Sequence, residues 1–445
     1  MKNFVTSYRP AKTATLKTDI ELASEVYDLL GQECIICDPT EVVYLWDKEQ
    51  PRNGWQRLHD PELRNMVRAK LLAFTNKPTV TLVNNVTKAI KDMVYQRDPQ
   101  MNLGGNEIVS FLNGDVQLLN GKWQLADTLL EHRRITRIPH CYDPTATAPM
   151  FCEFLDQTFE GDHDALDKQQ LILQMMGYSL QTHARHEKGI MTVGVGGNGK
   201  SVLDRVVKGM VGHDNFAAVQ PNNLDNNFQK ATMRLKLVNA ITESEQSSKL
   251  PTGHVKAIIS GEAMTVENKR KDPFVMHPFC TLWWATNHLP HANDYSEAIY
   301  RRMFIVEFNN TVPPEKRDTK LADKLVQQEM PGIIKMALDA YAEAVRSGFA
   351  LPDSVTEARK TWRIKSDSVA GWFNDCIEVV MLDEMEIPAR RAYEHYAVWC
   401  KTGGYAAVSE TSFSDRMTKL KHPSVKKSRG MVYSRMQFMQ GMQGF

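Results

Sequence analysis

The sequence predicts an α/β protein built around a P-loop nucleotide-binding core, with an α+β region before the core and a small basic domain after it. Three observations lead to this prediction. A phosphate-binding motif occupies residues 194–201 of the 445-residue chain. Short apolar segments alternate with helical stretches over residues 188–350, as in a sheet covered by helices. The last part of the chain is rich in lysine and arginine.

Composition bounds the class of protein. The chain is 42% hydrophobic and 24% charged, with a net charge of +1, so a nucleic-acid surface would have to be local. No apolar run approaches the ~18 residues that a membrane span needs. Residues 1–4 lack the apolar core of a signal peptide. We therefore expect a cytoplasmic protein without a membrane partner.

The cysteines do not indicate a disulfide framework, because there are seven of them in a long chain. Cys34 and Cys37 form a C-x-x-C motif, and the nearest possible second pair, His140 and Cys141, is remote in sequence. Two isoleucines between the cysteines favour a buried strand. We interpret the pair as core, and a metal or redox role is the alternative.

Changes in composition and pattern suggest the domain boundaries. Strand patterns at 41–46 and 107–112 and a helical pattern at 63–74 indicate a mixed N-terminal region. The expected parts are a flexible tail (1–20), an α+β N-terminal domain (21–150), a helical lead-in (151–187), the nucleotide-binding core (188–350) and a basic C-terminal domain (351–445).

Residues 194–201 match the P-loop pattern G-x-x-x-x-G-K-[ST] at every required position. Glycines let backbone N–H groups curl around phosphates, Lys200 adds positive charge, and the Ser201 hydroxyl can bind Mg²⁺. A strand pattern at 190–193 precedes the motif. The same glycines also fit the dinucleotide pattern G-x-G-x-x-G, but Lys200 and Ser201 favour a nucleoside triphosphate. The predicted phosphate-binding residues are Gly194, Gly196, Gly197, Asn198, Gly199, Lys200 and Ser201.

A P-loop requires acidic partners, one for Mg²⁺ and one for the attacking water. Residues 235–241 predict a buried strand that ends in Thr242, Glu243, Ser244 and Glu245. We expect Glu243 to lie nearest Mg²⁺ and Glu245 nearest the water, although the two roles could be exchanged. The alternative is a charged loop after a core strand.

Two further polar positions adjoin predicted strands. Asn287 follows the strand pattern at 279–285, where an amide could orient water or sense the γ-phosphate; an ordinary turn is the alternative. Arg301 and Arg302 precede a strand pattern at 303–308. Arginine can stabilise the charge on a transferred phosphoryl group. Sequence alone favours two arginines on a solvated helix end.

Two basic segments could meet nucleic acid. Residues 264–275 predict a β-hairpin with Lys269, Arg270 and Lys271 at its tip, either solvated or gripping DNA phosphates in a ring. Residues 411–435 carry one acid, Asp415, and interleaved Phe413 and Tyr433. This composition suits a winged helix on DNA, or a basic surface without a partner. The basic residues of this second segment are Arg416, Lys419, Lys421, Lys426, Lys427, Arg429 and Arg435.

These motifs, in this order, resemble the superfamily 3 helicases, and more closely the helicase half of the poxvirus-type and satellite-phage-type primase-helicases. The resemblance covers about residues 40–400. The segments that carry it are 111–114, 171–180, 194–201, 242–245, 260–278, 284–287, 297–302 and 329–334.

The resemblance implies an AAA+-like core that forms a homo-hexamer, hydrolyses ATP with Mg²⁺ between subunits and moves along single-stranded DNA to separate a fork. It implies replication of a phage, plasmid or mobile element. By this resemblance, Lys200 and Ser201 would hold phosphates and Mg²⁺, and Glu243 and Glu245 would be the Walker B acids. Asn287 would be the motif C sensor, and Arg301 or, preferentially, Arg302 would be the finger acting in trans. The residues implied for DNA are Lys269, Arg270 and Lys271.

The chain departs from this family in two ways. Glu262 stands where the family often has Asp, and no primase site is evident. Asp162 and Asp164 lie in a polar turn that we interpret as a loop. We therefore expect no primase activity and a separate primase, loader or polymerase as partner. The alternatives are a DNA-bound initiator or scaffold ATPase with little unwinding, and a small-molecule kinase, which would have no use for the basic segments.

Overall fold

The computed structural model describes most of the chain and divides into two units. The first unit comprises the described residues up to 105 together with 112–115 and 125–137, and the second comprises the rest. No helix in the described residues is long and apolar enough to cross a membrane. The described residues are 17–31, 35–46, 54–97, 99–105, 107–242, 249–292, 297–382, 385–403 and 407–439.

In the first unit, helices share one core with an antiparallel sheet of order β1-β2-β3. Val26, Val67 and Ile90 are buried in that core. Cys37 is also buried there, as expected, whereas Cys34 lies outside the described residues. The elements are α1 (Asp19–Leu30), β1 (Ile35–Cys37), β2 (Val43–Trp46), β3 (Trp55–Leu58), α2 (Asp60–Leu71) and α3 (Val80–Met93).

A five-stranded parallel sheet of order β15-β7-β13-β9-β8 organises the second unit. Both faces are covered by helices, which explains why its strands are apolar along most of their length. The predicted α/β class is confirmed, and the sheet of this unit is parallel. The strands are β7 (Gly189–Val193), β8 (Phe216–Ala217), β9 (Val238–Thr242), β13 (Thr281–Thr286) and β15 (Met303–Glu307).

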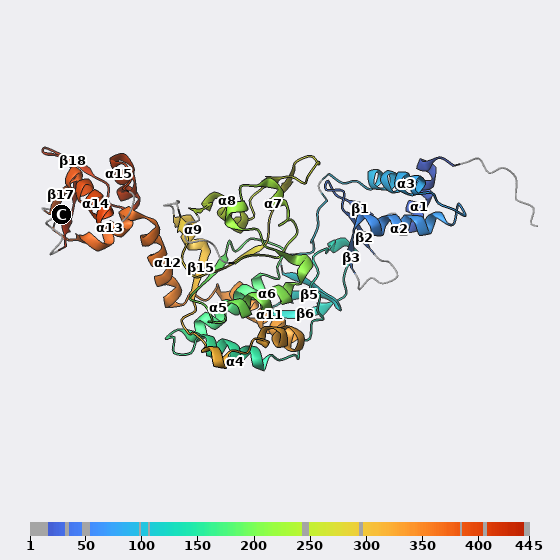
Figure 1. Ribbon diagram of the computed structural model, residues 1–445, viewed down its shortest axis with the longest axis horizontal. Helices are drawn as coiled ribbons and strands as arrows, with labels where there is room; N and C mark the ends of the chain where they lie inside the picture. Colours follow the sequence, from blue (N-terminus) through green and yellow to red (C-terminus); the bar gives the residue numbers. More distant parts are fainter. Residues whose placement is uncertain are drawn as a thin grey trace, which may run out of the picture. The chain divides into compact units, whose positions relative to one another are not determined.

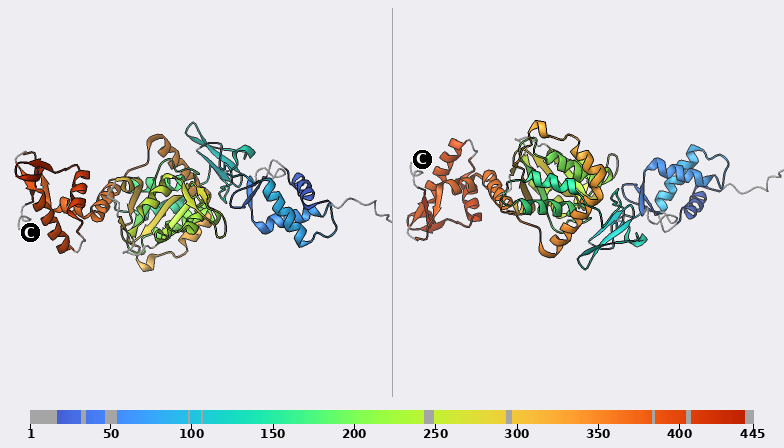
Figure 2. Two further views of the ribbon diagram at one scale, coloured as in Figure 1. Left: turned by 90° about the horizontal axis from the view of Figure 1, so that it is seen from above. Right: turned by 90° about the horizontal axis from the view of Figure 1, so that it is seen from below.

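Adjacent tryptophans in β13 show how the sheet separates two cores. Successive strand side chains point to opposite faces. Trp283 packs among residues of α5, α6 and α11, and its Nε1 donates to Ser179 Oγ at 2.8 Å. Trp284 packs with α8, α9 and α12 on the other face. Figure 1 shows α5, α6 and α11 on one side of the sheet and α8 on the other; Figure 2 shows the α5 side from below. These helices are α5 (Ala165–Tyr178), α6 (Lys200–Val211), α8 (Thr252–Ser260), α9 (Glu297–Arg302), α11 (Met330–Ser347) and α12 (Asp353–Ser366).

Two strands begin later than the sequence pattern predicts. We expected strands at 235–241 and 279–285, and the structure begins them at Val238 and Thr281. Leu235 adopts a φ of +59°, the left-handed conformation of a turn, so the chain is not yet extended there. The strands instead continue to Thr242 and Thr286.

The predicted helical lead-in consists of α4 (Pro149–Thr158) and α5, joined by a loop that contains both aspartates of the polar turn. Asp162 Oδ2 accepts from Lys168 Nζ at 2.7 Å, and Asp164 Oδ2 accepts from the Ser354 amide at 2.8 Å. The two carboxylates therefore hold this loop to neighbouring elements.

The C-terminal part has its own core, centred on Trp372, Tyr396 and Phe413. Two antiparallel sheets pair β16 with β20 and place β19 between β17 and β18. This core begins at Val369, whereas α12 packs against the parallel sheet through Ala358 and Trp362. A basic winged-helix domain from residue 351 stays a prediction. The elements are α13 (Ser368–Cys376), β16 (Ile377–Val379), β17 (Glu386–Pro388), α14 (Ala389–Gly403), α15 (Glu410–Lys419), β18 (Val425–Lys427), β19 (Gly430–Ser434) and β20 (Met436–Phe438).

Helices α5 and α11 approach closely where Gly177 lies against the backbone of Ala337. A Cβ on Gly177 would lie 2.1 Å from the Ala337 carbonyl oxygen. Since real Cβ atoms do not come that close to backbone, a larger residue would push the helices apart.

Gly177→Ala should therefore lower the free energy of unfolding by roughly 1–3 kcal/mol, measured by urea denaturation. Gly253→Ala in α8 is the matched control, because a Cβ there meets nothing within 4 Å. The control should be neutral or stabilising by up to about 1 kcal/mol. Equal stability of the two variants would contradict the close helix contact.

Candidate nucleotide-binding site

Strand register brings three separate loops to one edge of the parallel sheet. Thr286 of β13 pairs with Val193 of β7, and Ala285 pairs with Thr242 of β9. Since the carboxyl ends of parallel strands meet at one edge, the residues that follow these strands are neighbours. The edge of a parallel sheet at its strand carboxyl ends is where such folds bind ligands.

The P-loop lies between β7 and α6 and is fastened at its tip. Gly197 and Gly199 adopt φ of +80° and +90°, which a residue with a side chain rarely adopts. Asn198 Nδ2 donates to the Phe308 carbonyl at 2.9 Å, and the Val312 amide donates to the Gly197 carbonyl at 2.9 Å. The loop is therefore held by the segment that follows β15.

Lys200 lies inside the curve of the loop and is only 8% exposed. Its Nζ donates to the Val195 carbonyl and to Asn198 Oδ1, both at 3.0 Å, and to the Gly194 carbonyl. Burial lowers the pKa of the ammonium group. Next to it, the Ser201 side chain at the start of α6 is exposed.

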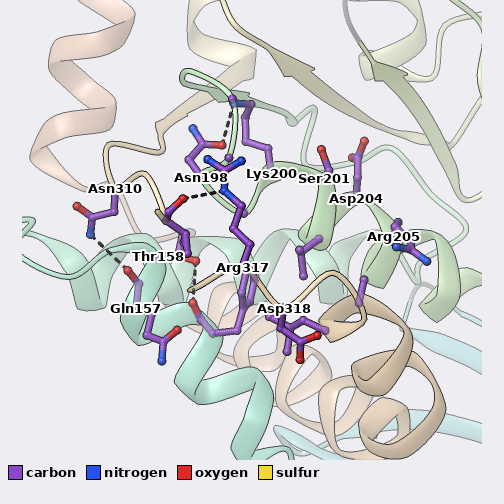
Figure 3. A pocket seen from close by; sticks show the side chains of 18 of the residues that line it. Gln157, Thr158, Asn198, Lys200, Ser201, Asp204, Arg205, Asn310, Arg317 and Asp318 are labelled. Carbon is purple, nitrogen blue, oxygen red and sulfur yellow. Dashed lines mark hydrogen bonds between the residues drawn. The ribbon is translucent and has the colours of Figure 1, made fainter. Parts of the chain in front are cut away.

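A pocket of about 760 Å³ opens over the P-loop (Figure 3). This volume is in the range of clefts that bind small molecules and cofactors. Apolar groups of α4, such as Phe154, line it together with polar groups at the strand ends. Besides residues 196–202, the lining includes Met150, Phe154, Gln157 and Thr158 of α4, Thr242, Thr286 and Asn287 at the strand ends, and Asn310, Val312, Arg317 and Asp318 after β15.

The structure places most of the predicted phosphate-site residues around this pocket. Asn287 lies on its wall, as does Thr242, the residue before the predicted Walker B acids. Glu243 and Glu245 themselves lie outside the described residues. The predicted residues that line the pocket are Gly196, Gly197, Asn198, Gly199, Lys200, Ser201 and Asn287, while Gly194 contributes its carbonyl to Lys200.

Asp204 is a pocket residue that the sequence pattern did not single out. It lies three positions after Ser201, and both side chains project from the same side of α6 (Figure 3). Burial raises the pKa of its carboxyl group from 3.8 to about 6. The i, i+3 spacing from Ser201 was the signal that could have identified it.

Because the pKa of Asp204 is higher in the folded than in the unfolded chain, its negative charge destabilises the fold above pH 6, and this cost fades as the pH falls toward 4. Asp204→Asn should therefore raise the free energy of unfolding of the nucleotide-free protein by about 1–2 kcal/mol at pH 8, and by less at pH 4.5.

Thermal or urea unfolding at the two pH values measures this difference. Asp214→Asn is the control, because that side chain is fully exposed. If Asp204→Asn and Asp214→Asn behave alike at pH 8, the raised pKa is wrong.

No sequence pattern identified Arg317 or Asp318 as pocket residues, because their positions depend on how the loop after β15 folds. Arg317 Nε donates to the Val312 carbonyl at 2.7 Å. Asp318 Oδ2 accepts from Lys324 Nζ at 2.7 Å. They bring one cation that faces the P-loop and one ion pair to the same pocket.

The predicted arginine finger candidates lie at the other edge of the sheet. Met303 pairs with Gly189, so Arg301 and Arg302 precede the first residue of their strand, whereas the P-loop follows the last residue of β7. Five residues of strand at ~3.3 Å each, about 16 Å, separate the two positions. Neither arginine can therefore reach the pocket of its own chain along this sheet.

The two arginines differ in their surroundings. Arg302 Nη2 pairs with Glu187 at 2.8 Å and Nη1 donates to the Ala298 carbonyl at 3.1 Å, with the side chain 11% exposed. Arg301 is exposed. The side chain presented to solvent is therefore Arg301, although the finger preferred from the resemblance is Arg302.

The predicted basic hairpin is present as β11 (Met264–Val266) and β12 (Phe274–Met276), with Val266 opposite Phe274. Lys269 and Arg270 are exposed at its tip, and Lys271 is half-buried. The Arg234 guanidinium lies 5.8 Å from the centre of the Phe274 ring at the base. A role in gripping DNA stays a prediction.

The C-terminal basic surface is smaller than its sequence suggested. Arg416 is buried and pairs with Asp367 at 3.1 Å, so it cannot meet a phosphate. Phe413 and Tyr433 are core residues because they fall on the apolar faces of α15 and β19. Lys427 pairs with Glu386. The exposed basic residues of this segment are Lys419, Lys421, Lys426, Lys427, Arg429 and Arg435.

Comparison with known families finds two partial matches. Residues 192–302 match a family of unknown function (DUF5906), and residues 364–436 match the Poxvirus D5 protein-like family. Putative helicase 184R of Invertebrate iridescent virus 6 is 21% identical over 245 residues, which cover 46% of this chain. The match spans a quarter of the viral protein, 25% of its length.

Solved structures of the NrS-1 C-terminal region are similar to this chain over almost its whole length. One, an A form apo structure, has a TM-score of 0.52 at 14% identity and covers 92% of this chain and 98% of its own. Another A form apo structure, of residues 305–718, has a TM-score of 0.50 at 13% identity, with 94% and 100% covered. The TM-scores show a shared fold. The matches together confirm the resemblance to the primase-helicase family.

Proposed function

We propose that this protein is an ATP-dependent DNA helicase that acts in the replication of a virus, phage, plasmid or other mobile element. The observation that carries the proposal is a P-loop pocket at one edge of a parallel sheet and an exposed arginine at the other. The name of the iridescent-virus relative, a putative helicase, and the D5-like match support the helicase class.

In the proposed site, ATP places its phosphates in the loop of residues 196–201. The glycine conformations and the buried Lys200 fit this role, since such a loop can turn backbone N–H groups and a cation toward phosphates. Ser201 and Glu243 would hold Mg²⁺, which neutralises phosphate charge when bound. Glu245 would polarise the attacking water, and Asn287 would sense the γ-phosphate.

We propose an AAA+-like superfamily 3 ring, a homo-hexamer in which each site is completed by a neighbour. Arg301 is exposed and cannot reach its own pocket, so we assign it as the finger that acts in trans. Arg302, held by Glu187, would position the helix end that carries Arg301. This assignment replaces the preference for Arg302 drawn from the resemblance.

Subunit mixing tests the shared site. Arg301→Ala and Lys200→Ala proteins should each lose at least about tenfold in ATP hydrolysis, because each lacks one half of every interface. Mixed rings contain some intact interfaces, so activity should partly return when the two variants are combined. No recovery in rings shown to be mixed would contradict a trans arginine, and recovery with Arg302→Ala but not Arg301→Ala would restore the original preference.

DNA would pass through the ring and contact the hairpin tip at Lys269, Arg270 and Lys271. Lysine and arginine meet DNA phosphates without regard to base sequence, which suits a motor that translocates on single-stranded DNA. The exposed lysines of the β18–β19 hairpin would let a winged-helix-like C-terminal domain bind DNA as well. A separate primase, loader or polymerase would complete the replication machinery.

An alanine triple variant at Lys269, Arg270 and Lys271 should abolish strand separation on a forked DNA. ATP hydrolysis should stay within about threefold of native, because none of the three residues lines the pocket. Val275→Ala is the control: it changes an exposed residue of the same hairpin without removing charge. Unwinding retained by the triple variant would favour the alternative, a DNA-bound initiator or scaffold.

A further inference from the structure

The segment 308–318, here named the strap, connects β15 to the nucleotide pocket and touches both of its walls. Asn310 Nδ2 donates to the Glu160 carbonyl at 2.6 Å and to the Gln157 carbonyl at 3.3 Å, at the end of α4. Two further hydrogen bonds, from Asn198 to the Phe308 carbonyl and from the Val312 amide to the Gly197 carbonyl, fasten the strap to the P-loop.

The guanidinium of Arg317, in the same strap, rests directly on the P-loop (Figure 3). A Cβ on Gly197 would lie 2.3 Å from Arg317 Nη2 and 2.6 Å from Cζ. A side chain at position 197 would therefore displace the guanidinium from this place. Nε donates to the Val312 carbonyl at 2.7 Å, which orients the group, and the two Nη groups have no acceptor among the described residues.

The other cations of the pocket are already engaged. Lys200 is buried and donates to three oxygens of the loop. Arg205 pairs with Asp323, and Lys324 pairs with Asp318. Among the described residues, Arg317 is thus the pocket cation whose two Nη groups remain available as donors. A planar guanidinium can donate two parallel hydrogen bonds to a phosphate, which a lysine cannot.

We infer that Arg317 binds the phosphate chain of the nucleotide held by its own subunit. This inference rests on the proposed function and deepens it, since no sequence motif assigned this residue. With nucleotide bound, the Nη groups donate to phosphate oxygens above Gly197, and Nε keeps its bond to Val312. Because Val312 is itself bonded to Gly197, phosphate binding draws the strap and the loop into one ordered unit.

Nucleotide affinity of the full chain, measured by isothermal calorimetry with Mg²⁺–ATP and with AMP, tests the inference. Arg317→Ala should weaken ATP binding by 10- to 100-fold, the usual effect of losing hydrogen bonds to a charged group. AMP binding should change by less than about threefold, since most of the phosphate chain is missing. Arg317→Lys should fall between native and alanine because it keeps the charge and loses the fork.

Arg346→Ala is the matched control, an exposed arginine on α11 outside the pocket. Hydrogen exchange of the strap should slow on ATP binding in the native protein and not in Arg317→Ala. Unchanged ATP affinity in Arg317→Ala, or an equal loss for ATP and AMP, would overturn the inference while leaving the proposed function intact. Failure of the native protein to bind ATP would overturn both.

Discussion

The parallel register of β7, β9 and β13 is the constraint on which the candidate site depends. The P-loop, Thr242 and Asn287 are distant in sequence, and they meet because Val193 pairs with Thr286 and Thr242 with Ala285. A slip of one residue would exchange the faces of Trp283 and Trp284 and bury each in the wrong core. The two tryptophans therefore help to fix the geometry of the candidate site.

Strand β15 connects the two arginines that precede it with the strap that follows it. Arg301 and Arg302 lie at its start, and the strap with Arg317 follows its end. This short strand thus connects Arg301, which faces solvent where a neighbouring subunit would bind, with Arg317, which rests on the P-loop of the same subunit. Helices pack on both faces of the sheet. A shift of β15 at one end would therefore move its other end as well, because the close-packed core leaves little room for the strand to deform. This arrangement supports our proposal that ATP sites are shared within a ring.

Sequence reasoning predicted the elements that follow from local pattern. The P-loop, the sheet strands and the basic hairpin were found from glycines, apolar runs and turn residues. Strand β9 begins later than predicted because Leu235 turns the chain, and β13 also begins two residues late. It did not predict Arg317 or Asp204, whose positions depend on loop folding and burial. It also overestimated the C-terminal basic surface, because nothing local reveals that Arg416 pairs with Asp367 in the core.

In the proposed ring each subunit carries the P-loop half of one ATP site and the arginine half of the next, so hydrolysis would require assembly. The most direct measurement is ATP turnover per subunit over a wide range of protein concentration with single-stranded DNA present, alongside sedimentation velocity of the same samples. The account predicts turnover that rises in step with the oligomer and is lost in the monomer. Turnover per subunit that stays constant down to concentrations where the protein is monomeric would contradict it.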